Sequence, residues 1–569
     1  MSRSLSAPEI SRILHDMAVL MEVRGDNPFK ARAYANASRL VESWGVQLFA
    51  LVEAGTLAQQ KGIGPGLTQA ITELVATGRL AAYDELRGAL PAGIADLIKI
   101  PGLGPKKIQT LFATLAIQTL GELEYACIEN RLTALRGFGA KTQEKILAGI
   151  AYVKQQHGQH RYDVALAEAE SVLAALRAHP SVKRASIAGS LRRRKDIVKD
   201  ADLVASTDAP EDVMAFFTTL PRVERVTSHG PTRSAATLVS GIAVDLRVVD
   251  DRAFPYALHH STGSKEHHTL LRGYAKQQGL KMNEYGLFRG EEEIRCDDEA
   301  AIYAALGLAS IPPELREGTG EIEAAAENRL PDLVDTPAIL GVFHAHTTYS
   351  DGRASVEEMA RAAHELGYRY LGISDHSQAA HYANGMSPER VVQQRAEIAA
   401  VRDKLPALTV FHGAEVDILP DGSLDYPDEL LASLDFVIAS VHSQFGQSRD
   451  DMTRRVVRAI RHPAVTMLGH ATGRLILARE AYALDMDRVL DAAAAAGVVM
   501  ELNANPRRLD IDWRVCREAK SRGILLSINP DAHRIEGLRD VGYGVGIARK
   551  GWLEASDVFN TRSAAAMTD

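Results

Sequence analysis

The stretch Ile187–Ser206, IAGSLRRRKDIVKDADLVAS, decides how the first half of this 569-residue chain is interpreted. Asp200 and Asp202 are two residues apart on a predicted strand, so both carboxylates project from the same face. Asp245, in the predicted strand AVDLRVV, offers a third acid from a neighbouring strand. Two Mg²⁺ ions that hold the attacking and leaving oxygens of phosphoryl transfer need such converging carboxylates. We therefore expect these three acids to be catalytic metal ligands.

The start of the same stretch predicts a phosphate site. Gly189-Ser190 offers a tight turn whose amide and hydroxyl bind phosphate, and Arg193 follows within reach of the same anion. An isolated D-x-D is more often a solvated strand edge, and the run Arg192–Lys195 is equally compatible with a solvated face. The Gly-Ser turn and the third strand acid together favour a nucleotidyltransferase site, with Gly189, Ser190 and Arg193 on the triphosphate.

Residues 1–160 are predicted to form short helices with turns at Gly and Pro. A short repeat recurs there, G-h-G followed by an amphipathic helix, which is the helix–hairpin–helix pattern. Its glycines let the backbone approach a DNA phosphate, and the next helix N-terminus offers free N–H groups. One copy is more often a plain turn, but three copies in one frame favour sequence-independent DNA binding. The expected DNA-binding residues are Gly62, Gly64, Gly102, Gly104, Lys106, Gly137, Gly139 and Lys141.

Composition sets limits for the whole chain. It is 46% hydrophobic and 24% charged, as in globular proteins, and its length exceeds what one core supports, so three to five domains are expected. Three cysteines far apart exclude a disulfide scaffold and a C-x-x-C zinc finger. A net charge of −8 excludes DNA binding through a general positive field. The lack of a signal-peptide core or a membrane-length apolar run predicts a cytoplasmic protein.

From about residue 338, predicted strands alternate with helices, which indicates parallel strands and a barrel-like α/β fold. Histidines and acids recur at the C-terminal ends of these strands, where barrel enzymes build active sites. A lone histidine there is more often structural, but nine such residues are hard to attribute to packing. This mixture of ligands suits two or three ions of Zn²⁺, Mn²⁺ or Fe. The expected ligands are His344, His346, Asp351, His376, Glu415, His442, His470, Asp531 and His533.

Residues 1 to about 316 resemble a bacterial family X DNA polymerase, related to DNA polymerase beta. G-S-x-R-R followed by D-x-D is shared with many nucleotidyltransferases, whereas HHSTGSKEHHTLLRGYAKQQGLKMNEYGLF (259–288) is far more specific to family X thumbs. The resemblance implies nucleotide-binding roles for Thr262, Gly263, Ser264, Lys265 and His268. It also implies DNA contacts for Arg272 and Tyr285.

This sequence departs from the family pattern at two places in the thumb. The family usually has an aromatic residue before T-G-S, at the deoxyribose, where His260-Ser261 stands here, and an asparagine at the position of His268. Ser261 is smaller than an aromatic wall and able to hydrogen-bond a 2′-hydroxyl. We therefore expect weak selection against ribonucleotides.

The region from about 338 to 569 resembles the polymerase and histidinol phosphatase (PHP) domain, a metal-dependent phosphoesterase with a distorted β/α barrel. The matching motifs are HAHTTYSDG, ISDHS, GAEVD, ASVHSQF, LGHATGRL and NPDAH, and they contain all nine family ligands. Val342 stands where the family often has an Asp, which implies no missing metal ligand. The resemblance also suggests Arg474 as a phosphate-binding residue.

The expected architecture is therefore multidomain, with helical N-terminal domains, an α+β nucleotidyltransferase palm and thumb, and a C-terminal α/β distorted TIM-like barrel. The predicted boundaries are 1–88 for a helical DNA-binding domain, 89–160 for a helical fingers-like domain with two helix–hairpin–helix motifs, 161–251 for the palm, 252–316 for the thumb, 317–337 for an extended acidic linker and 338–569 for the PHP domain.

The two resemblances imply a DNA repair polymerase that fills short gaps and a PHP domain that acts as a 3′–5′ exonuclease, with abasic-site cleavage as a further candidate activity. The polymerase site would use Mg²⁺ or Mn²⁺. The expected partners are gapped or primer–template DNA and dNTPs, the expected state is a monomer, and no membrane is involved. One alternative is a metal-dependent nuclease whose polymerase half only binds DNA. Another is a small-molecule nucleotidyltransferase, which the three helix–hairpin–helix copies disfavour.

Overall fold

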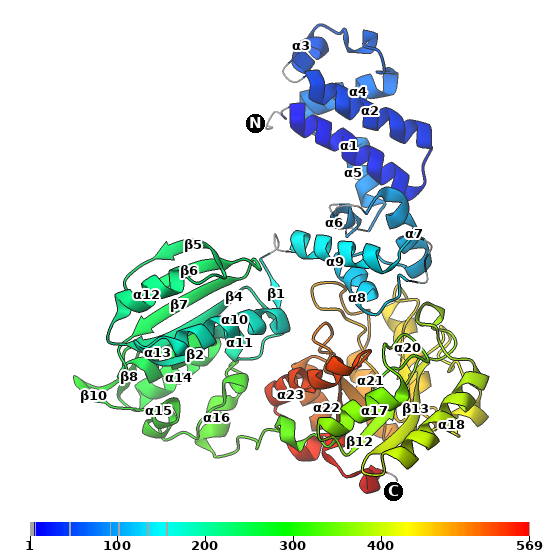
Figure 1. Cartoon of the computed structure of the whole chain (residues 1–569). Helices are drawn as coiled ribbons and strands as arrows, with labels where there is room; N and C mark the ends of the chain where they lie inside the picture. The colour runs from blue at the N-terminus through cyan, green and yellow to red at the C-terminus, as the bar shows by residue number, and fades with distance from the viewer. Residues whose placement is uncertain are drawn as a thin grey trace. The chain divides into compact units, whose positions relative to one another are not determined.

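The computed structural model (Figure 1) describes residues 5–567 apart from 6, 45–46, 92, 99, 101–102, 134, 136 and 155–157. The chain divides into two compact units, residues 1–154 and residues 155–569. No helix in the described ranges is long and apolar enough to span a bilayer.

The N-terminal unit is helical throughout its described residues, and its glycine turns set the helix starts. α4 and α7 begin directly after Gly64 and Gly104, each with a proline as first residue, where a missing N–H costs nothing. Gly62 and Gly137 have φ of +95° and +93°, which glycine adopts without strain. The helices are α1 (Ala7–Arg24), α2 (Pro28–Trp44), α3 (Gln47–Glu53), α4 (Pro65–Thr77), α5 (Ala81–Gly88), α6 (Ile94–Leu97), α7 (Pro105–Leu115), α8 (Leu120–Ile128) and α9 (Ala140–Lys154).

The C-terminal unit begins with a palm built on a five-stranded sheet in the order β2-β4-β7-β6-β5. β4 and β7 are parallel, and the other neighbours are antiparallel. Helix α10 packs on β2 and β4, and α12 on β5, β6 and β7. The elements are β1 (His160–Arg161), α10 (Tyr162–Ala178), β2 (Val182–Ile187), α11 (Gly189–Arg192), β3 (Ile197–Val198), β4 (Asp200–Thr207), α12 (Pro210–Thr218), β5 (Val223–His229), β6 (Arg233–Leu238) and β7 (Ala243–Val249).

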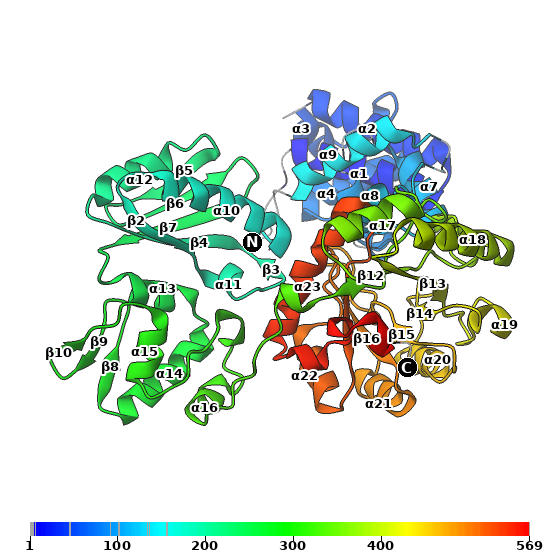
Figure 2. The same cartoon turned by 60° about the horizontal axis from the view of Figure 1, so that its bottom comes forward.

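The thumb follows through α13, which packs on β4 of the palm and on α15 of the thumb (Figure 2). Its small sheet is antiparallel in the order β10-β9-β8. The thumb thus shares a buried helix with the palm. Its elements are α13 (Phe254–Thr262), α14 (Lys265–Gln277), β8 (Leu280–Met282), β9 (Leu287–Arg289), β10 (Glu292–Ile294) and α15 (Glu299–Ala305).

The segment predicted to be an extended linker is folded onto its neighbours, so that prediction is wrong. Helix α16 (Glu321–Ala326) packs on α14. Glu321 is fully buried, and one of its carboxylate oxygens lies 2.7 Å from His267 Nδ1. Arg517 of the barrel donates to the Thr319 carbonyl at 2.9 Å. Acidic and proline-rich composition predicts a solvated segment, but these partners are distant in sequence and no local pattern reveals them.

The last region is the expected barrel-like fold, with seven parallel strands paired in sequence order from β11 to β17. Beyond the first and last strands, Ala345 bridges Ala532, and the His346 N–H donates to the Ala532 carbonyl at 2.9 Å. This bridge gathers the C-terminal ends of the strands at one rim. The strands are β11 (Gly341–Val342), β12 (Tyr370–Ile373), β13 (Thr409–Asp417), β14 (Phe436–Ser440), β15 (Met467–Leu468), β16 (Val499–Asn503) and β17 (Leu526–Asn529).

Helices cover the outside of the barrel strands, so residues on both faces of a strand are buried. All five residues of β14, for example, are buried, as parallel strands covered by helices require. The helices are α17 (Val356–Glu365), α18 (Pro388–Lys404), α19 (Asp428–Leu431), α20 (Arg449–Ile460), α21 (Met486–Ala496), α22 (Trp513–Ser521) and α23 (Val541–Lys550).

Candidate active sites

The palm sheet brings the three predicted acids into one neighbourhood. Asp202 and Asp245 are register partners across β4 and β7, and Asp200 precedes Asp202 by two residues on the same strand. Burial, and then the charges of Asp200 and Asp245, raise the pKa of Asp202 to about 6. Carboxylates that repel one another in this way are held ionised at neutral pH by a bound cation. The donor set therefore fits Mg²⁺ or Mn²⁺.

Gly189 lies so close to Asp202 that a residue with a side chain does not fit at this position. Its φ is +62°, and a Cβ at this position would lie 1.9 Å from Asp202 Oδ2. Ser190 follows at the start of the short helix α11. The turn predicted to bind phosphate is thus in contact with one of the acids predicted to bind metal.

Two arginines are paired within this site. Arg233 on β6 donates through Nε and Nη2 to Asp245, at 2.8 and 3.2 Å. Arg193 reaches into the thumb, where its Nη1 donates to the Thr262 carbonyl and its Nε donates to Glu317 at 3.1 Å. Sequence reasoning singled out Arg193 but missed Arg233 and Glu317, whose contacts depend on strand pairing and on palm–thumb packing.

The predicted nucleotide-binding residues of the thumb lie where α13 meets α14. Thr262 and Gly263 are buried at this junction, next to Arg193. Ser264 caps α14, since its hydroxyl accepts the His267 N–H at 3.2 Å, and Lys265 is exposed just after it. Through Arg193, this turn therefore contacts the part of the palm that is predicted to bind phosphate.

The two unusual histidines of the thumb pack against each other. The rings of His260 and His268 are stacked, with centroids 5.3 Å apart and planes 20° apart. His268 Nε2 lies 2.9 Å from the His260 carbonyl oxygen. Burial lowers the pKa of His268 to about 4, so its ring is neutral at physiological pH and donates to that carbonyl.

The predicted DNA-binding residues of the N-terminal unit lie in its three glycine turns. Gly62 and Gly64 precede α4, Gly104 precedes α7, and Gly137 and Gly139 precede α9. Gly102 lies outside the described residues. The side chains of Lys106 and Lys141 are exposed, each in the first turn of its helix. In the thumb, Arg272 and Tyr285 are also exposed.

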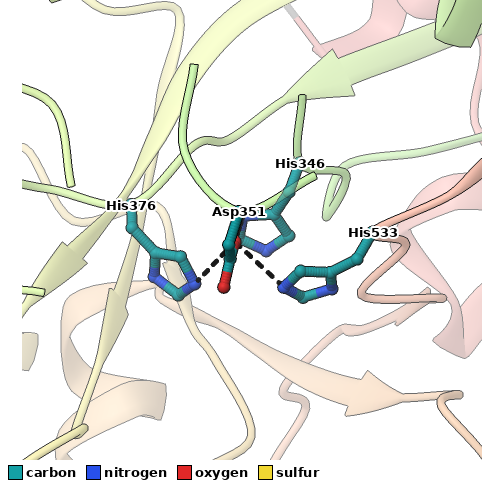
Figure 3. A group of neighbouring side chains, drawn as sticks. All are labelled: His346, Asp351, His376 and His533. Carbon is teal, nitrogen blue, oxygen red and sulfur yellow. Dashed lines mark ion pairs between the residues drawn. The ribbon is translucent and has the colours of Figure 1, made fainter. Parts of the chain in front are cut away.

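All nine predicted ligands of the barrel converge at the rim. Each comes from the C-terminal end of a strand or the loop after it, although β13 continues two residues past Glu415 to Asp417. These residues form four sets, and within each set the ligand atoms lie within 4.8 Å of one another. Figure 3 shows one of these sets. The sets are His346, Asp351, His376 and His533; His344, Glu415 and His470; His344, His346 and Asp531; and His376, Glu415 and His442.

Carboxylates bridge these sets. Glu415 lies 2.8 Å from His470 Nε2, 2.9 Å from His376 Nδ1 and 3.2 Å from His442 Nε2. In Figure 3, Asp351 lies between His376 and His533, at 3.6 and 3.3 Å. Carboxylates that each touch several imidazoles would be able to hold metal ions together with them.

The donor atoms themselves test whether metal ions fit. His344 and His346 are fully buried, and the Nε2 atoms of both have no hydrogen-bond partner. Buried polar groups without partners are rare and costly, and here they all point toward one centre. Glu415 Oε2 is in the same condition. Imidazole nitrogens and carboxylates together are a donor set that fits Zn²⁺, Mn²⁺ or Fe²⁺.

Comparison with known proteins covers both halves. Family models match at residues 6–80 (helix–hairpin–helix domain), 94–151 (SAM-like helix–hairpin–helix tandem), 257–317 (DNA polymerase beta thumb) and 343–505 (PHP domain). The DNA polymerase/3′-5′ exonuclease PolX of Bacillus subtilis is 39% identical over 559 residues, which cover 98% of this chain and 97% of that protein. This chain belongs to the bacterial family X DNA polymerases with a C-terminal PHP domain. Both resemblances drawn from the sequence are thereby confirmed.

The PHP region of this family X polymerase also has relatives that match this region alone. A probable phosphatase of Thermoanaerobacter sp. is 28% identical over 205 residues, which cover 34% of this chain and 79% of that protein. A probable phosphatase of Aliivibrio fischeri is 29% identical over 214 residues, which cover 35% of this chain and 78% of that protein. The barrel of the polymerase thus matches proteins that lack the polymerase half.

Two further carboxylates, which the sequence analysis missed, contact predicted metal-binding histidines of the polymerase on the side away from the cluster. Glu501 lies 2.6 Å from His344 Nδ1, and Asp417 lies 3.3 Å from His442 Nδ1. In each case the other ring nitrogen, Nε2, faces the cluster. A signal for Glu501 exists in the sequence, since it is the one acid in the apolar strand VVMELN.

Asp375, next to the ligand His376, anchors the loop that carries Asp351. Its carboxylate accepts the backbone N–H groups of Thr347 and Ser350 at 2.8 and 3.1 Å, and also both hydroxyls. Gln394 donates to it as well. Asp375 therefore binds the loop rather than the metal centre.

Arg474 does not face the cluster, which argues against the predicted phosphate contact. Its Nε donates to the Arg508 carbonyl at 2.9 Å, and its Nη2 donates to the Leu509 carbonyl. Its Nη1 lies 3.3 Å from Asp196 of the palm. Arg474 is thus occupied in holding the segment around Arg508 and in joining barrel to palm.

Proposed function

We propose that this chain fills short DNA gaps by template-directed nucleotidyl transfer and hydrolyses phosphodiesters from DNA 3′ ends in its barrel. The observation that carries the polymerase half of the proposal is the contact between Gly189 and Asp202, with Asp245 in register beside it. The nine convergent ligands carry the exonuclease half. Abasic-site cleavage in the same barrel is a secondary candidate that uses the same chemistry.

In the palm, each residue has a distinct task. Asp200, Asp202 and Asp245 would hold Mg²⁺ or Mn²⁺, which neutralise charge on the triphosphate and activate the primer 3′-hydroxyl. Gly189 and Ser190 would bind phosphate oxygens through the backbone amide and hydroxyl. Arg193 would meet the same anion while its Nε remains on Glu317. Without a metal ion, Arg233 neutralises the charge of Asp245, and binding of a cation would require Arg233 to give up part of this contact.

The thumb turn would contact the nucleotide beside this phosphate site. Thr262, Gly263 and Ser264 form the turn, with Lys265 and His268 in the following helix, and Arg272 and Tyr285 would contact DNA nearby. The helix–hairpin–helix turns at Gly62-Gly64, Gly102-Gly104 and Gly137-Gly139, with Lys106 and Lys141, would bind the DNA backbone without sequence preference.

In the barrel, two or three ions of Zn²⁺, Mn²⁺ or Fe would polarise the scissile phosphate and supply a nucleophile at neutral pH. The residues of the chain hold the donors in place. Glu415, Asp531 and the buried histidines would be among the residues that hold these ions, and the burial of the histidines limits the access of bulk water. Because the two sets of residues are separate, the proposal predicts that the palm and the barrel use different metal ions, one for nucleotidyl transfer and the other for phosphodiester hydrolysis.

A nuclease whose polymerase half only binds DNA is the second candidate. The ion pair between Arg233 and Asp245 favours it, since that pair competes with metal binding. Primer extension across a one-nucleotide gap separates the two candidates. Incorporation that depends on Asp202 supports the first, and DNA binding without incorporation supports the second. The cytoplasmic location and the monomeric state stay predictions.

A further inference from the structure

Two buried Glu–His pairs in this chain have nearly the same chemistry. In the barrel, Glu501 on β16 lies 2.6 Å from His344 Nδ1 and accepts the His470 backbone N–H at 2.7 Å. In the thumb, Glu321 lies 2.7 Å from His267 Nδ1 and accepts the Thr319 N–H at 2.7 Å. Both glutamates are 0% exposed. In each pair the carboxylate keeps the proton on Nδ1, so the ring presents its Nε2 to whatever lies beyond.

The two pairs differ in what Nε2 meets. His267 Nε2 lies 3.1 Å from the Tyr303 hydroxyl, which donates to it, so this ring is satisfied within the thumb. His344 Nε2 has no hydrogen-bond partner. It faces Glu415 Oε2 at 3.3 Å and Asp531 Oδ1 at 3.5 Å, and both of these are acceptors. A lone pair that faces two carboxylates is unfavourable, so either a metal ion or a proton on Nε2 has to stand between them.

Glu501 does more than touch one histidine. Its remaining acceptor positions take the side-chain N–H groups of Asn503 and Asn529, both at 3.2 Å. Four donors thus fix the carboxylate, which has about four acceptor positions in total. Through the His470 N–H it also fixes the backbone of a second ligand. His344 itself belongs to two of the four ligand sets.

We propose that Glu501 is a positioning residue of the barrel's metal centre. It holds His344 in the tautomer whose Nε2 binds the ion, and it holds the backbone from which His470 reaches Glu415. It binds no ion itself, because all of its acceptor positions are filled by protein donors. This inference rests on the proposed metal-dependent function of the barrel.

Mn²⁺ titration of the full-length chain tests this role without any assay of DNA hydrolysis. The protein is stripped with a chelator and titrated calorimetrically as wild type, Glu501→Gln and Glu321→Gln. Each variant loses a buried carboxylate that accepts from a histidine and a backbone N–H, so Glu321→Gln reproduces the structural damage away from the metal centre. Outer partners of metal-binding histidines typically affect affinity by about 10–100-fold. We expect the tightest Mn²⁺ Kd to rise by about this factor in Glu501→Gln and to stay within about twofold in Glu321→Gln.

Unchanged Mn²⁺ affinity in Glu501→Gln would overturn the proposal, and so would an equal loss in both variants. If Glu501→Gln does not fold, Glu501→Asp replaces it. That side chain keeps the charge but is one methylene too short for His344 Nδ1, so a several-fold weaker Kd is expected, and wild-type affinity again overturns the role. Hydrolysis by the wild type is measured separately. Tight Mn²⁺ binding without DNA hydrolysis would refute the proposed exonuclease function and leave the role of Glu501 standing.

Discussion

The palm site and the barrel site both gather acids for metal ions, but they are assembled to different degrees. In the barrel, nine ligands from different strands meet in four sets whose atoms lie within 4.8 Å, and most of them are fully buried. The described palm residues form no such set. Asp200 is exposed there, and Asp245 is paired with Arg233. The barrel therefore resembles a site for resident ions, whereas the palm resembles a site completed by ions that arrive with the nucleotide.

The two sites differ because different contacts hold their side chains in place. Barrel ligands are held by carboxylates behind them, as Glu501 holds His344 and Asp375 holds the loop of Asp351. Palm acids lie on two neighbouring strands with solvent on one side, where Asp202 contacts the glycine turn at Gly189 and Asp245 is paired with Arg233. Preorganisation lowers the cost of binding an ion, and an open site allows substrate and metal to enter together.

The largest effect is expected for Glu415→Ala, because this carboxylate touches histidines of several ligand sets. Removing it would take away a negatively charged donor that belongs to two of the four ligand sets. We expect phosphodiester hydrolysis to fall by about 10³-fold or more, equivalent to about 4 kcal/mol of transition-state stabilisation. Initial rates on a 3′-labelled strand measure this. Hydrolysis within tenfold of wild type would show that the barrel is not the nuclease site.

A smaller effect is expected for Asp375→Asn, which keeps the shape of the side chain but weakens its hold on Thr347 and Ser350. We expect hydrolysis and Mn²⁺ affinity to fall by about 10–100-fold, as for other outer-sphere changes. Tyr349→Phe is the matched control, since it removes a hydrogen bond of the same loop, to Glu397 at 2.9 Å, on another side. Equal losses in both variants would mean that general loosening of the loop, and not Asp375, sets the site.

Some features of the two sites could be predicted from the sequence, and others could not. The convergence of the nine predicted barrel ligands and the pairing of the acids on β4 and β7 could be predicted, because strand ends and two-residue spacing are visible in the sequence. Residues 317–337 were predicted to form an extended linker, but Glu321 in this segment is buried against His267, a partner 54 residues away in the sequence. The contact between Arg193 and Glu317 was hidden for the same reason, since these residues are 124 positions apart in the sequence. Contacts that close over such separations leave no local pattern.

The palm offers a test through stability. The folded-state pKa of Asp202 is raised to about 6, above its usual value, so the folded state holds the proton more tightly than the unfolded state. This contribution stabilises the fold at low pH and is lost as pH rises from about 4 to about 6. At pH 7.5 without metal, Asp202→Asn should therefore stabilise the protein by about 1–3 kcal/mol while abolishing incorporation.

Thermal unfolding in chelator, at pH 7.5 and at pH 4, measures this stability change. The gain should shrink at the lower pH. A variant that is destabilised at pH 7.5 would contradict the charge repulsion on which the palm description depends.

The smallest effect concerns sugar selection beside the stacked pair His260 and His268. Ser261 offers little bulk against a 2′-hydroxyl and leaves no polar group unpaired, so discrimination is worth only about 1–3 kcal/mol. We expect kcat/KM for a deoxynucleotide to exceed that for the matching ribonucleotide by about 10–200-fold. Measured opposite one template base, a preference of ~10⁴ or more would show that another wall excludes the hydroxyl.

The central claim is that one chain holds two chemically separate metal sites. The most direct test is one reaction that reports both activities. A one-nucleotide gap with a labelled primer is incubated with wild type, Asp200→Ala or His344→Ala. We expect Asp200→Ala to shorten the primer without extending it and His344→Ala to extend the primer without shortening it. If either variant, folded as judged by circular dichroism, loses both activities, the two sites are not independent and the account is contradicted.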